Sequence, residues 1–317
     1  MAKSRYILLD WLAYLGLRLF AMFVHMFGWE ANYRTARWIS EAIWWAGRRW
    51  PKLGRFEQRA TTHLRLSFPD WPAGRIERTA KASLRNFIYL GVEVLFTTRL
   101  ITPARWRRHV TLVNQAENVR LMLERKTPLI YVSGHFGNWE VVGYNMGALG
   151  FPMTAVARPL DNPFISRYIY GIRARRGMTI LDKKGAAEQA GDLLANKGLL
   201  SFIADQDAGR KGCFVDFFGR KASTYKSIAL LAMQYGAPIV VGYGRRLDEE
   251  YHFALGIQRV IHPHEWADKP DPMRWITQEY TRALEEVVRS APEQYLWTHR
   301  RWKHRPKGEP EAPDGIA

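Results

Sequence analysis

A histidine between two glycines separates an apolar run from an apolar helical pattern near the middle of the chain. The segment reads Val132-Ser133-Gly134-His135-Phe136-Gly137-Asn138-Trp139-Glu140. The apolar run 129–133 predicts a buried strand, so we expect His135 on a loop at the carboxyl end of that strand. Gly134 and Gly137 permit backbone torsions and close approaches that larger residues forbid. An imidazole in such a place suits general-base catalysis, because its ordinary pKa lies near neutral pH.

Glu140 is the acidic partner that this segment offers to His135. Within a single helix the two side chains would point about 140° apart and could not pair. With His135 on the loop and Glu140 in the first helical turn, the carboxylate can turn back, hold one tautomer and stabilise the imidazolium formed during proton transfer. In the alternative interpretation His135 only fills a turn and Glu140 only suits the helix dipole. The spacing alone leaves both interpretations open.

Short apolar runs alternate with helical patterns through the rest of the chain. We predict strands at 129–133, 153–157, 178–181, 199–204, 239–242 and 253–260, and helices at 139–149, 162–175, 185–196, 223–235 and 272–289. This alternation predicts an α/β fold with a mostly parallel central sheet flanked by helices. In such sheets the ligand lies beyond the carboxyl ends of the strands. Residues 32–99 show helical periodicity throughout.

Charged residues follow two more of these strands. Arg158 comes directly after 153–157, so we expect it at the same sheet edge as His135, where a planar guanidinium suits phosphate oxygens. In the alternative interpretation Arg158 only caps a helix or is solvated in a loop. Asp205, Gln206 and Asp207 follow 199–204. Paired carboxylates can bind a metal or transfer protons, but no accompanying histidine or carboxylate spacing completes a ligand set, so no metal is expected.

The N-terminal segment 7–29 is mostly apolar, and its three polar interruptions share one helical face (Asp10, Arg18 and His25). It is long enough to cross a bilayer, although an ionisable residue at mid-depth costs roughly 2.5–3.5 kcal/mol. We expect a membrane anchor, spanning or half-inserted; an interfacial helix and a buried core helix are the alternatives. No small-residue cleavage site follows, so a signal peptide is not expected. The expected organisation is an anchor helix at 1–30, a catalytic domain with a helical lead-in at 31–306 and a disordered tail at 307–317.

The composition points to an anionic partner. Lys and Arg total 47 against 30 Asp and Glu, a net charge of +17, and the chain has 13 Trp and one Cys. Charge and Trp together favour a membrane surface over DNA, and a single cysteine excludes an intrachain disulfide framework. The basic and aromatic stretch 295–307 fits nucleic acid, an anionic lipid surface or an acidic protein equally well.

The segment 134–140 resembles the His-x4-Asp/Glu motif of the lysophospholipid acyltransferase superfamily, and its Gly-Asn-Trp-Glu wording is that of the lipid A biosynthesis lauroyl/myristoyl acyltransferase branch. Further segments resemble that branch in order, namely 157–163, 173–177, 204–207, 215–219 and 292–303. Asp-Gln-Asp at 205–207 departs from the Pro-Glu-Gly type of the glycerolipid branch but fits the lipid A branch. The resemblance covers about residues 1–306.

This resemblance implies a glycerolipid acyltransferase-like fold and an enzyme at the cytoplasmic face of the inner membrane. Its substrates would be an acyl carrier protein thioester and a hydroxyl of an anionic lipid A precursor, with no cofactor, metal or nucleic-acid partner. His135 would take the proton from that hydroxyl, without a covalent acyl-enzyme, and Glu140 would orient His135. The remaining implied residues bind substrate or hold the loop beside it (Arg158, Arg173, Arg176, Asp205 and Gln206).

Two alternatives stay open. The same chemistry could act on another acceptor, such as a phosphatidylinositol mannoside, another membrane glycolipid or a lysophospholipid. A non-catalytic membrane-binding or nucleic-acid-binding protein could also keep the fold. Only a catalyst should lose its function when His135 is replaced by Ala in a folded protein. The sequence does not distinguish acyl carrier protein from coenzyme A as the donor, nor does it give the acyl chain length.

Overall fold

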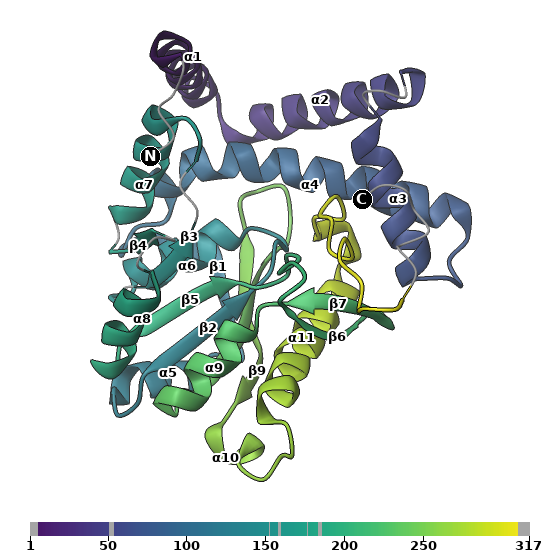
Figure 1. Cartoon of the computed structure of the whole chain (residues 1–317). Coiled ribbons are helices and arrows are strands. Elements are labelled where there is room, and N and C mark those ends of the chain that lie inside the picture. The colour runs from purple at the N-terminus through teal and green to yellow at the C-terminus, as the bar shows by residue number, and fades with distance from the viewer. Residues whose placement is uncertain are drawn as a thin grey trace.

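The computed structural model describes residues 6–50, 54–151, 153–157, 160–175, 177–182 and 186–309. Its centre is a seven-stranded sheet in the order β1-β9-β8-β2-β5-β3-β4 (Figure 1). Every neighbouring pair in it is parallel except β8 and β9, which confirms the predicted, mostly parallel α/β sheet. The strands are β1 (Val110–Val113), β2 (Leu129–Ser133), β3 (Thr154–Ala157), β4 (Thr179–Asp182), β5 (Leu199–Ile203), β8 (Ile239–Arg246) and β9 (Phe253–Ile261).

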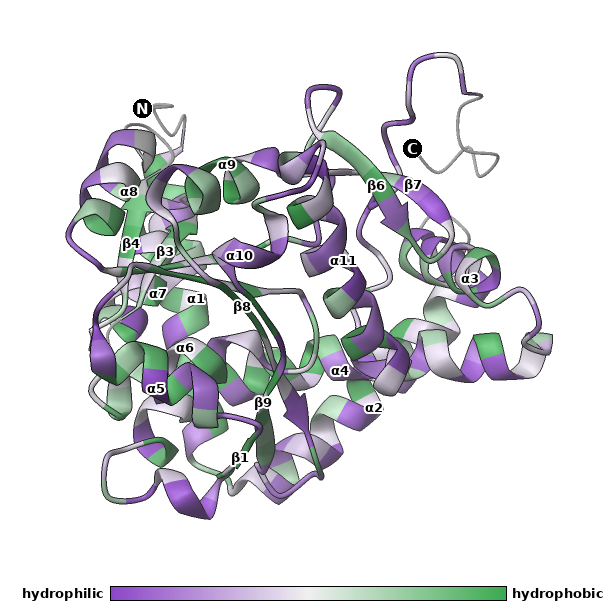
Figure 2. Ribbon diagram, turned by 90° about the horizontal axis from the view of Figure 1, so that it is seen from below, coloured by the Kyte–Doolittle hydropathy of each residue, from purple (hydrophilic) through white to green (hydrophobic). Residues whose placement is uncertain are grey.

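Helices cover both faces of the sheet, because the central strands alternate apolar side chains between two cores. In β2, Leu129 and Tyr131 enter one core and Ile130 and Val132 enter the other. The first core is covered by α4 (Ala73–Leu100), α5 (Ala116–Glu124) and α6 (Trp139–Ala148). The second is covered by α8 (Ala186–Ala195), α9 (Lys226–Tyr235), α10 (Pro263–Trp266) and α11 (Pro272–Ser290). Figure 2 shows β8 and β9 hydrophobic along most of their length, whereas these helices mix hydrophobic and hydrophilic residues.

The N-terminal part of the chain is helical, as predicted, with α1 (Ile7–His25), α2 (Trp29–Arg49) and α3 (Arg55–Ser67) preceding α4. Helix α1 is long and apolar enough to cross a membrane. Only two of its residues, Ala21 and Val24, are buried. This contradicts the alternative of a buried core helix, because a core helix would cover most of its apolar side chains.

A short hairpin that the sequence reading missed lies outside the main sheet. Strands β6 (Cys213–Phe217) and β7 (Arg220–Thr224) pair antiparallel across Phe218 and Gly219. Both turn residues have positive φ, +53° and +70°, the pattern of a two-residue hairpin turn. Phe217 and Phe218 pack into a third core with α3, α4 and α11. The remaining short elements are the 3₁₀ turns η1 (Trp106–Arg108) and η2 (Pro292–Gln294). Of the tail predicted to be disordered, residues 310–317 lie outside the described part of the chain.

Candidate active site

His135 and Asp205 face each other at the carboxyl ends of the neighbouring strands β2 and β5. Ser133 is the register partner of Ile203, and each charged residue comes two positions later. The His135 Nδ1 atom lies 2.7 Å from Oδ1 of Asp205, and the backbone N–H of His135 donates to Oδ2 at 2.9 Å. One carboxylate therefore fixes both the ring and the backbone of the histidine.

The electrostatics of this pair favour an ionised carboxylate. Asp205 is buried, and burial alone would raise its pKa, but the charge and hydrogen bonds of His135 hold the pKa well below its ordinary range. An ionised carboxylate only accepts hydrogen bonds, so Nδ1 of His135 carries the hydrogen. When the ring is neutral, the other ring nitrogen, Nε2, has the lone pair that a general base needs.

Glu140 is held by Arg173 rather than by His135. The Nε atom of Arg173, on α7 (Pro163–Ala174), donates to Oε2 of Glu140 at 3.0 Å, and a second guanidinium nitrogen contacts Oε1. This differs from the expected pairing of Glu140 with the imidazole. The physical reason is that Asp205 already occupies the Nδ1 side of the ring, while the start of α6 turns its carboxylate towards α7. Arg173, expected to bind substrate, is taken up by this ion pair; burial lowers its pKa, but Glu140 outweighs that and raises it overall.

The other predicted site residues divide into two groups. Gln206 holds the loop through its backbone, since its carbonyl accepts a hydrogen bond from Arg301 at 3.1 Å. Its neighbour Asp207 accepts one from the His304 ring at 2.6 Å. Arg158 and Arg176 lie outside the described residues, so their role at phosphate stays a prediction.

The N–H groups of the histidine loop, residues 135–138, donate to acceptors inside the protein. The N–H of Phe136 donates to Gly134, that of Gly137 to Gln294 at 2.9 Å, and that of Asn138 to Gly244 at 2.7 Å. Gly137 has a φ of +56°, and a Cβ atom there would lie 1.9 Å from the Gly244 carbonyl oxygen. The loop is therefore rigid, and the close approach requires glycine.

The C-terminal segment 295–304 packs against the histidine loop and forms the layer beneath it. The N–H of Leu296 donates to the His135 carbonyl at 3.0 Å, and Tyr295 forms a β-bridge with Phe136. The guanidinium of Arg301 is buried and donates to the Gln206 and Ser223 carbonyls and the Thr224 hydroxyl. The sequence favours a surface that binds an anionic partner for this stretch, but four of its residues are buried (Tyr295, Trp297, Arg301 and Trp302). Trp297 and Arg301 donate to acceptors inside the protein, and the rings of Tyr295 and Trp302 pack against Phe217.

His299 is a site residue that the sequence reading missed. Its ring centroid lies 4.3 Å from that of His135. Burial and then the neighbouring His135 lower its pKa to about 4, so it is neutral at pH 7. Its Nε2 atom is buried and has no hydrogen-bond partner within the described residues. No spacing in the chain signals this contact, since 164 positions separate the two rings in sequence and only the fold brings them together.

The side chains of His135, Asp205 and His299 also make up a donor set of the kind that zinc accepts, with ligand atoms within 4.8 Å of one another. The 2.7 Å separation between Nδ1 and Oδ1 is that of a shared hydrogen. A zinc ion held by both atoms would sit roughly 2.0–2.2 Å from each and replace that hydrogen. The expected absence of a metal remains a prediction.

Comparisons with known proteins identify the family of this chain. A sequence model described as bacterial lipid A biosynthesis acyltransferase matches residues 2–304. The lipid A biosynthesis palmitoleoyltransferase of Escherichia coli is 30% identical over 82% of this chain and 82% of its own length, and the lauroyltransferase is 29% identical over 78% and 79%. A phosphatidylinositol mannoside acyltransferase of Mycolicibacterium smegmatis is 23% identical over 67% of this chain and 72% of its own. The chain belongs to the bacterial lipid A biosynthesis acyltransferase family.

Proposed function

We propose that this acyltransferase moves a fatty acyl chain from an acyl thioester to a hydroxyl or hydroxyacyl group of a lipid A precursor, with His135 as the general base. The observation that carries the proposal is the 2.7 Å contact between His135 and a buried, ionised Asp205 at the carboxyl edge of the sheet. Ligands of α/β sheets bind at that edge. Family membership supplies the acyl-transfer chemistry, and the names of its relatives supply the acceptor.

The reaction needs one proton carrier and no covalent enzyme intermediate. The Nε2 atom of His135 takes the proton from the acceptor hydroxyl, whose oxygen attacks the thioester carbonyl carbon. The tetrahedral intermediate collapses, the carbon–sulfur bond breaks, and the thiolate takes the proton from the imidazolium. Asp205 stabilises the imidazolium between these steps and keeps the ring in one tautomer, as the acid of a catalytic triad does. Ester and thiol are the products, and the histidine is regenerated.

In this proposal Glu140 positions the histidine loop and does not contact the imidazole. Its ion pair with Arg173 joins the first turn of α6 to α7, so it fixes the end of the helix that directly follows the histidine loop. A partly buried bidentate pair gives geometric specificity as well as energy. Arg158 and Arg176 are proposed as phosphate contacts on the acceptor, on the strength of their place after β3 and α7 in the chain.

The net charge of the chain and the exposed apolar surface of α1 support our choice of acyl donor and cellular location. Acyl carrier protein is acidic, and a chain with net charge +17 would attract it at long range. Helix α1 leaves most of its apolar side chains uncovered, which supports insertion into the membrane. We therefore propose acyl carrier protein as the donor and the cytoplasmic face of the inner membrane as the location. A phosphatidylinositol mannoside is the second candidate acceptor, because one relative carries that name.

Transfer in detergent tests the proposal. The substrates are radiolabelled lauroyl- or myristoyl-acyl carrier protein and a bis-phosphorylated lipid A precursor, with the coenzyme A thioester and a phosphatidylinositol mannoside as comparisons. We expect His135→Ala and Asp205→Asn to lose about 10²- to 10⁴-fold in kcat. His264→Ala, on the short α10, serves as the matched control and should keep wild-type turnover. Equal turnover by wild type and His135→Ala, with unchanged melting curves, would remove His135 as the base.

A further inference from the structure

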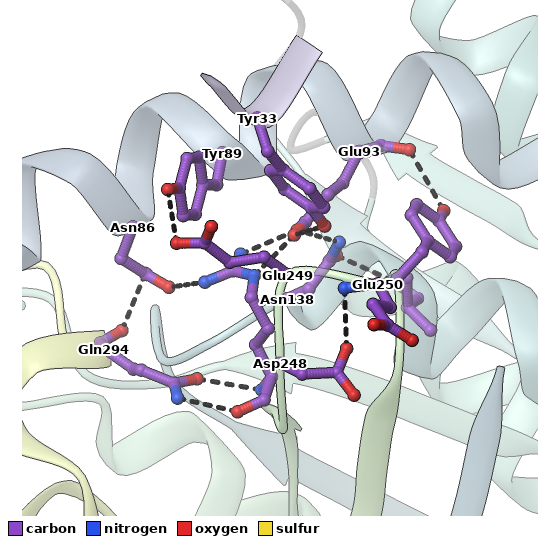
Figure 3. Close-up of polar contacts among 12 residues, drawn as sticks. Tyr33, Asn86, Tyr89, Glu93, Asn138, Asp248, Glu249, Glu250 and Gln294 are labelled. Carbon is purple, nitrogen blue, oxygen red and sulfur yellow. Dashed lines mark hydrogen bonds and ion pairs between the residues drawn. The ribbon is translucent and has the colours of Figure 1, made fainter. Parts of the chain in front are cut away.

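The carboxylate of Glu93, on α4, is completely buried and bonded on every side (Figure 3). Its Oε1 atom accepts from the Tyr33 hydroxyl at 2.6 Å and from Nε of Arg246. Its Oε2 atom accepts from a second Arg246 nitrogen at 2.7 Å and from the Asn138 side-chain amide at 2.8 Å. Residues from three other parts of the chain thus donate hydrogen bonds to this one buried carboxylate.

Asn138 links this buried charge to the catalytic loop. It is the third residue after His135 and the N-cap of α6, and its Oδ1 atom accepts the Val141 N–H at 3.0 Å. The other half of the same amide, Nδ2, donates to Glu93. Serine and threonine also cap helices well, but their single hydroxyl oxygen cannot occupy both positions that the amide oxygen and nitrogen of Asn138 occupy, and aspartate has no donor. Asparagine alone among the good caps therefore fits both contacts.

A second path runs from the ion pair to the loop through Gln294. Its side chain bonds both the N–H and the carbonyl of Arg246 at 2.8 Å. Its backbone carbonyl accepts from Gly137 at 2.9 Å and from the Asn86 amide at 3.0 Å, and Asn86 in turn bonds Arg246. The loop is thus held on both sides of Gly137 by groups anchored on one ion pair.

We propose that Glu93 is a positioning residue for acyl transfer, acting through Asn138 to fix the His135 loop against the start of α6. The inference rests on the proposed role of His135 as the base. The expected effect is on the placement of the ring, because a shift of about 1 Å in a reacting group costs roughly 10²-fold in rate. Neither Glu93 nor Asn138 needs to touch substrate for this effect.

We call the contact from Asn138 to Glu93 the brace. The variant that isolates it is Asn138→Ser, which keeps a capping oxygen for α6 but has no second polar atom at the position from which Nδ2 of Asn138 donates to Glu93. We expect kcat to fall about 10- to 100-fold with KM little changed, in protein whose melting curve shows it to be folded. Glu249→Gln is the matched control. Glu249 also pairs with a tyrosine of α4 and an arginine of α2, Tyr89 and Arg37, but it has no contact with the loop among the described residues. It should keep the wild-type kcat.

Two further measurements separate positioning from a merely structural role. In a His135→Ala background Asn138→Ser should lower the residual rate no further, because the brace works through that ring. Glu93→Gln should show the same loss of kcat as Asn138→Ser, and the double variant should be no slower than Glu93→Gln alone. If Glu93→Gln does not fold, the Asn138 variant carries the test by itself. A folded Asn138→Ser with wild-type kcat, or a further loss in the His135→Ala background, overturns the proposal.

A readout that needs no turnover keeps this proposal distinct from the proposed function. In histidine-labelled full-length protein in detergent, Asn138→Ser should shift the NMR signals of the His135 ring and leave those of His264 unchanged. Absence of transfer by the wild type with every donor and acceptor would overturn the proposed function, whereas unchanged His135 signals in Asn138→Ser would overturn the brace.

Discussion

Two regions of this molecule are rich in tryptophan and arginine, and the fold treats them in opposite ways. On α2 the side chains of Trp38 and Trp45 are 73% and 63% exposed, whereas Trp297 and Trp302 near the C-terminus are 1% and 2% exposed. The C-terminal residues find partners inside the protein. Trp297 donates to the Pro292 carbonyl at 2.6 Å, and Trp302 stacks on Phe217.

In the described part of the N-terminal region, α1 and α2 expose many large apolar side chains (Leu8, Leu12, Leu19, Phe23, Trp38, Ile39, Ile43 and Trp45). Large exposed apolar surfaces mark sites of interaction with membranes or partners. The difference shows that composition identifies residues suited to an interface, while packing against the rest of the fold decides whether they are buried or exposed.

The largest loss of stability is expected for Arg301→Met in the C-terminal framework, by which we mean the segment 295–304 with its internal hydrogen bonds. The change removes a buried cation and leaves the carbonyls of Gln206 and Ser223 without their donor. Breaking a buried polar network in this way costs about 3–5 kcal/mol of unfolding free energy. Chemical denaturation should show this loss, and Arg49→Ala on exposed α2 should change the unfolding free energy by less than about 0.5 kcal/mol. Equal stabilities for the two variants would contradict the contrast between the regions.

The same framework predicts a pH dependence through His299. Its pKa is about 4 in the folded protein and about 6.5 when unfolded, so between these pH values the unfolded chain binds a proton that the folded chain excludes. Unfolding free energy should therefore fall as the pH drops from about 6.5 to about 4, by at most roughly 3 kcal/mol from this group. The stabilising effect of Asp205, whose pKa is lowered, is lost only below about pH 3.9 and lies outside this window.

Thermal melting at several pH values measures this slope. His299→Gln should flatten it between pH 6.5 and 4, while His264→Gln should leave it as in the wild type. A slope that is the same in wild type and His299→Gln would show that this imidazole is not the group responsible.

The smallest effect on stability is expected where the tryptophans are exposed. Trp38→Ala combined with Trp45→Ala should change the unfolding free energy in detergent by less than about 1 kcal/mol, because neither residue is buried. Binding to anionic vesicles should nevertheless weaken, because tryptophan favours the membrane interface. Co-sedimentation with vesicles tests this, with Trp302→Ala as the opposite case that destabilises the fold. Vesicle binding equal to that of the wild type would place the membrane contact elsewhere.

The regular elements of the sheet were predictable because their signals are local. The strand at 129–133 and five others were predicted to within a few residues at most ends, since each is a compact apolar run. Strand β1 was missed because it has only four residues, interrupted by Thr111, and only Val110 among them is buried. The β6–β7 hairpin was missed because its two strands have only five residues each and lie among glycines, at Gly209, Gly212 and Gly219.

The partner of His135 was not predictable from local signals. Glu140 lies nearest in sequence, but β5 inserts between β2 and β3 in the sheet, and this order brings Asp205 opposite the histidine. The chain order of the strands does not reveal that insertion, because β3 and β4 come before β5. Asn138 was not predicted as a site residue, since its contact is with Glu93, 45 positions away.

The bond from Leu296 to His135 has a consequence for biosynthesis. The chain leaves the ribosome from its N-terminus, so α1 emerges and can insert into the membrane long before residues 294–304 exist. The sheet and His135 are also made early, but the layer beneath the loop is among the last parts of the described chain to be translated. The loop that carries the proposed base is therefore completed by contacts from residues that are translated after α1 and after all strands of the sheet.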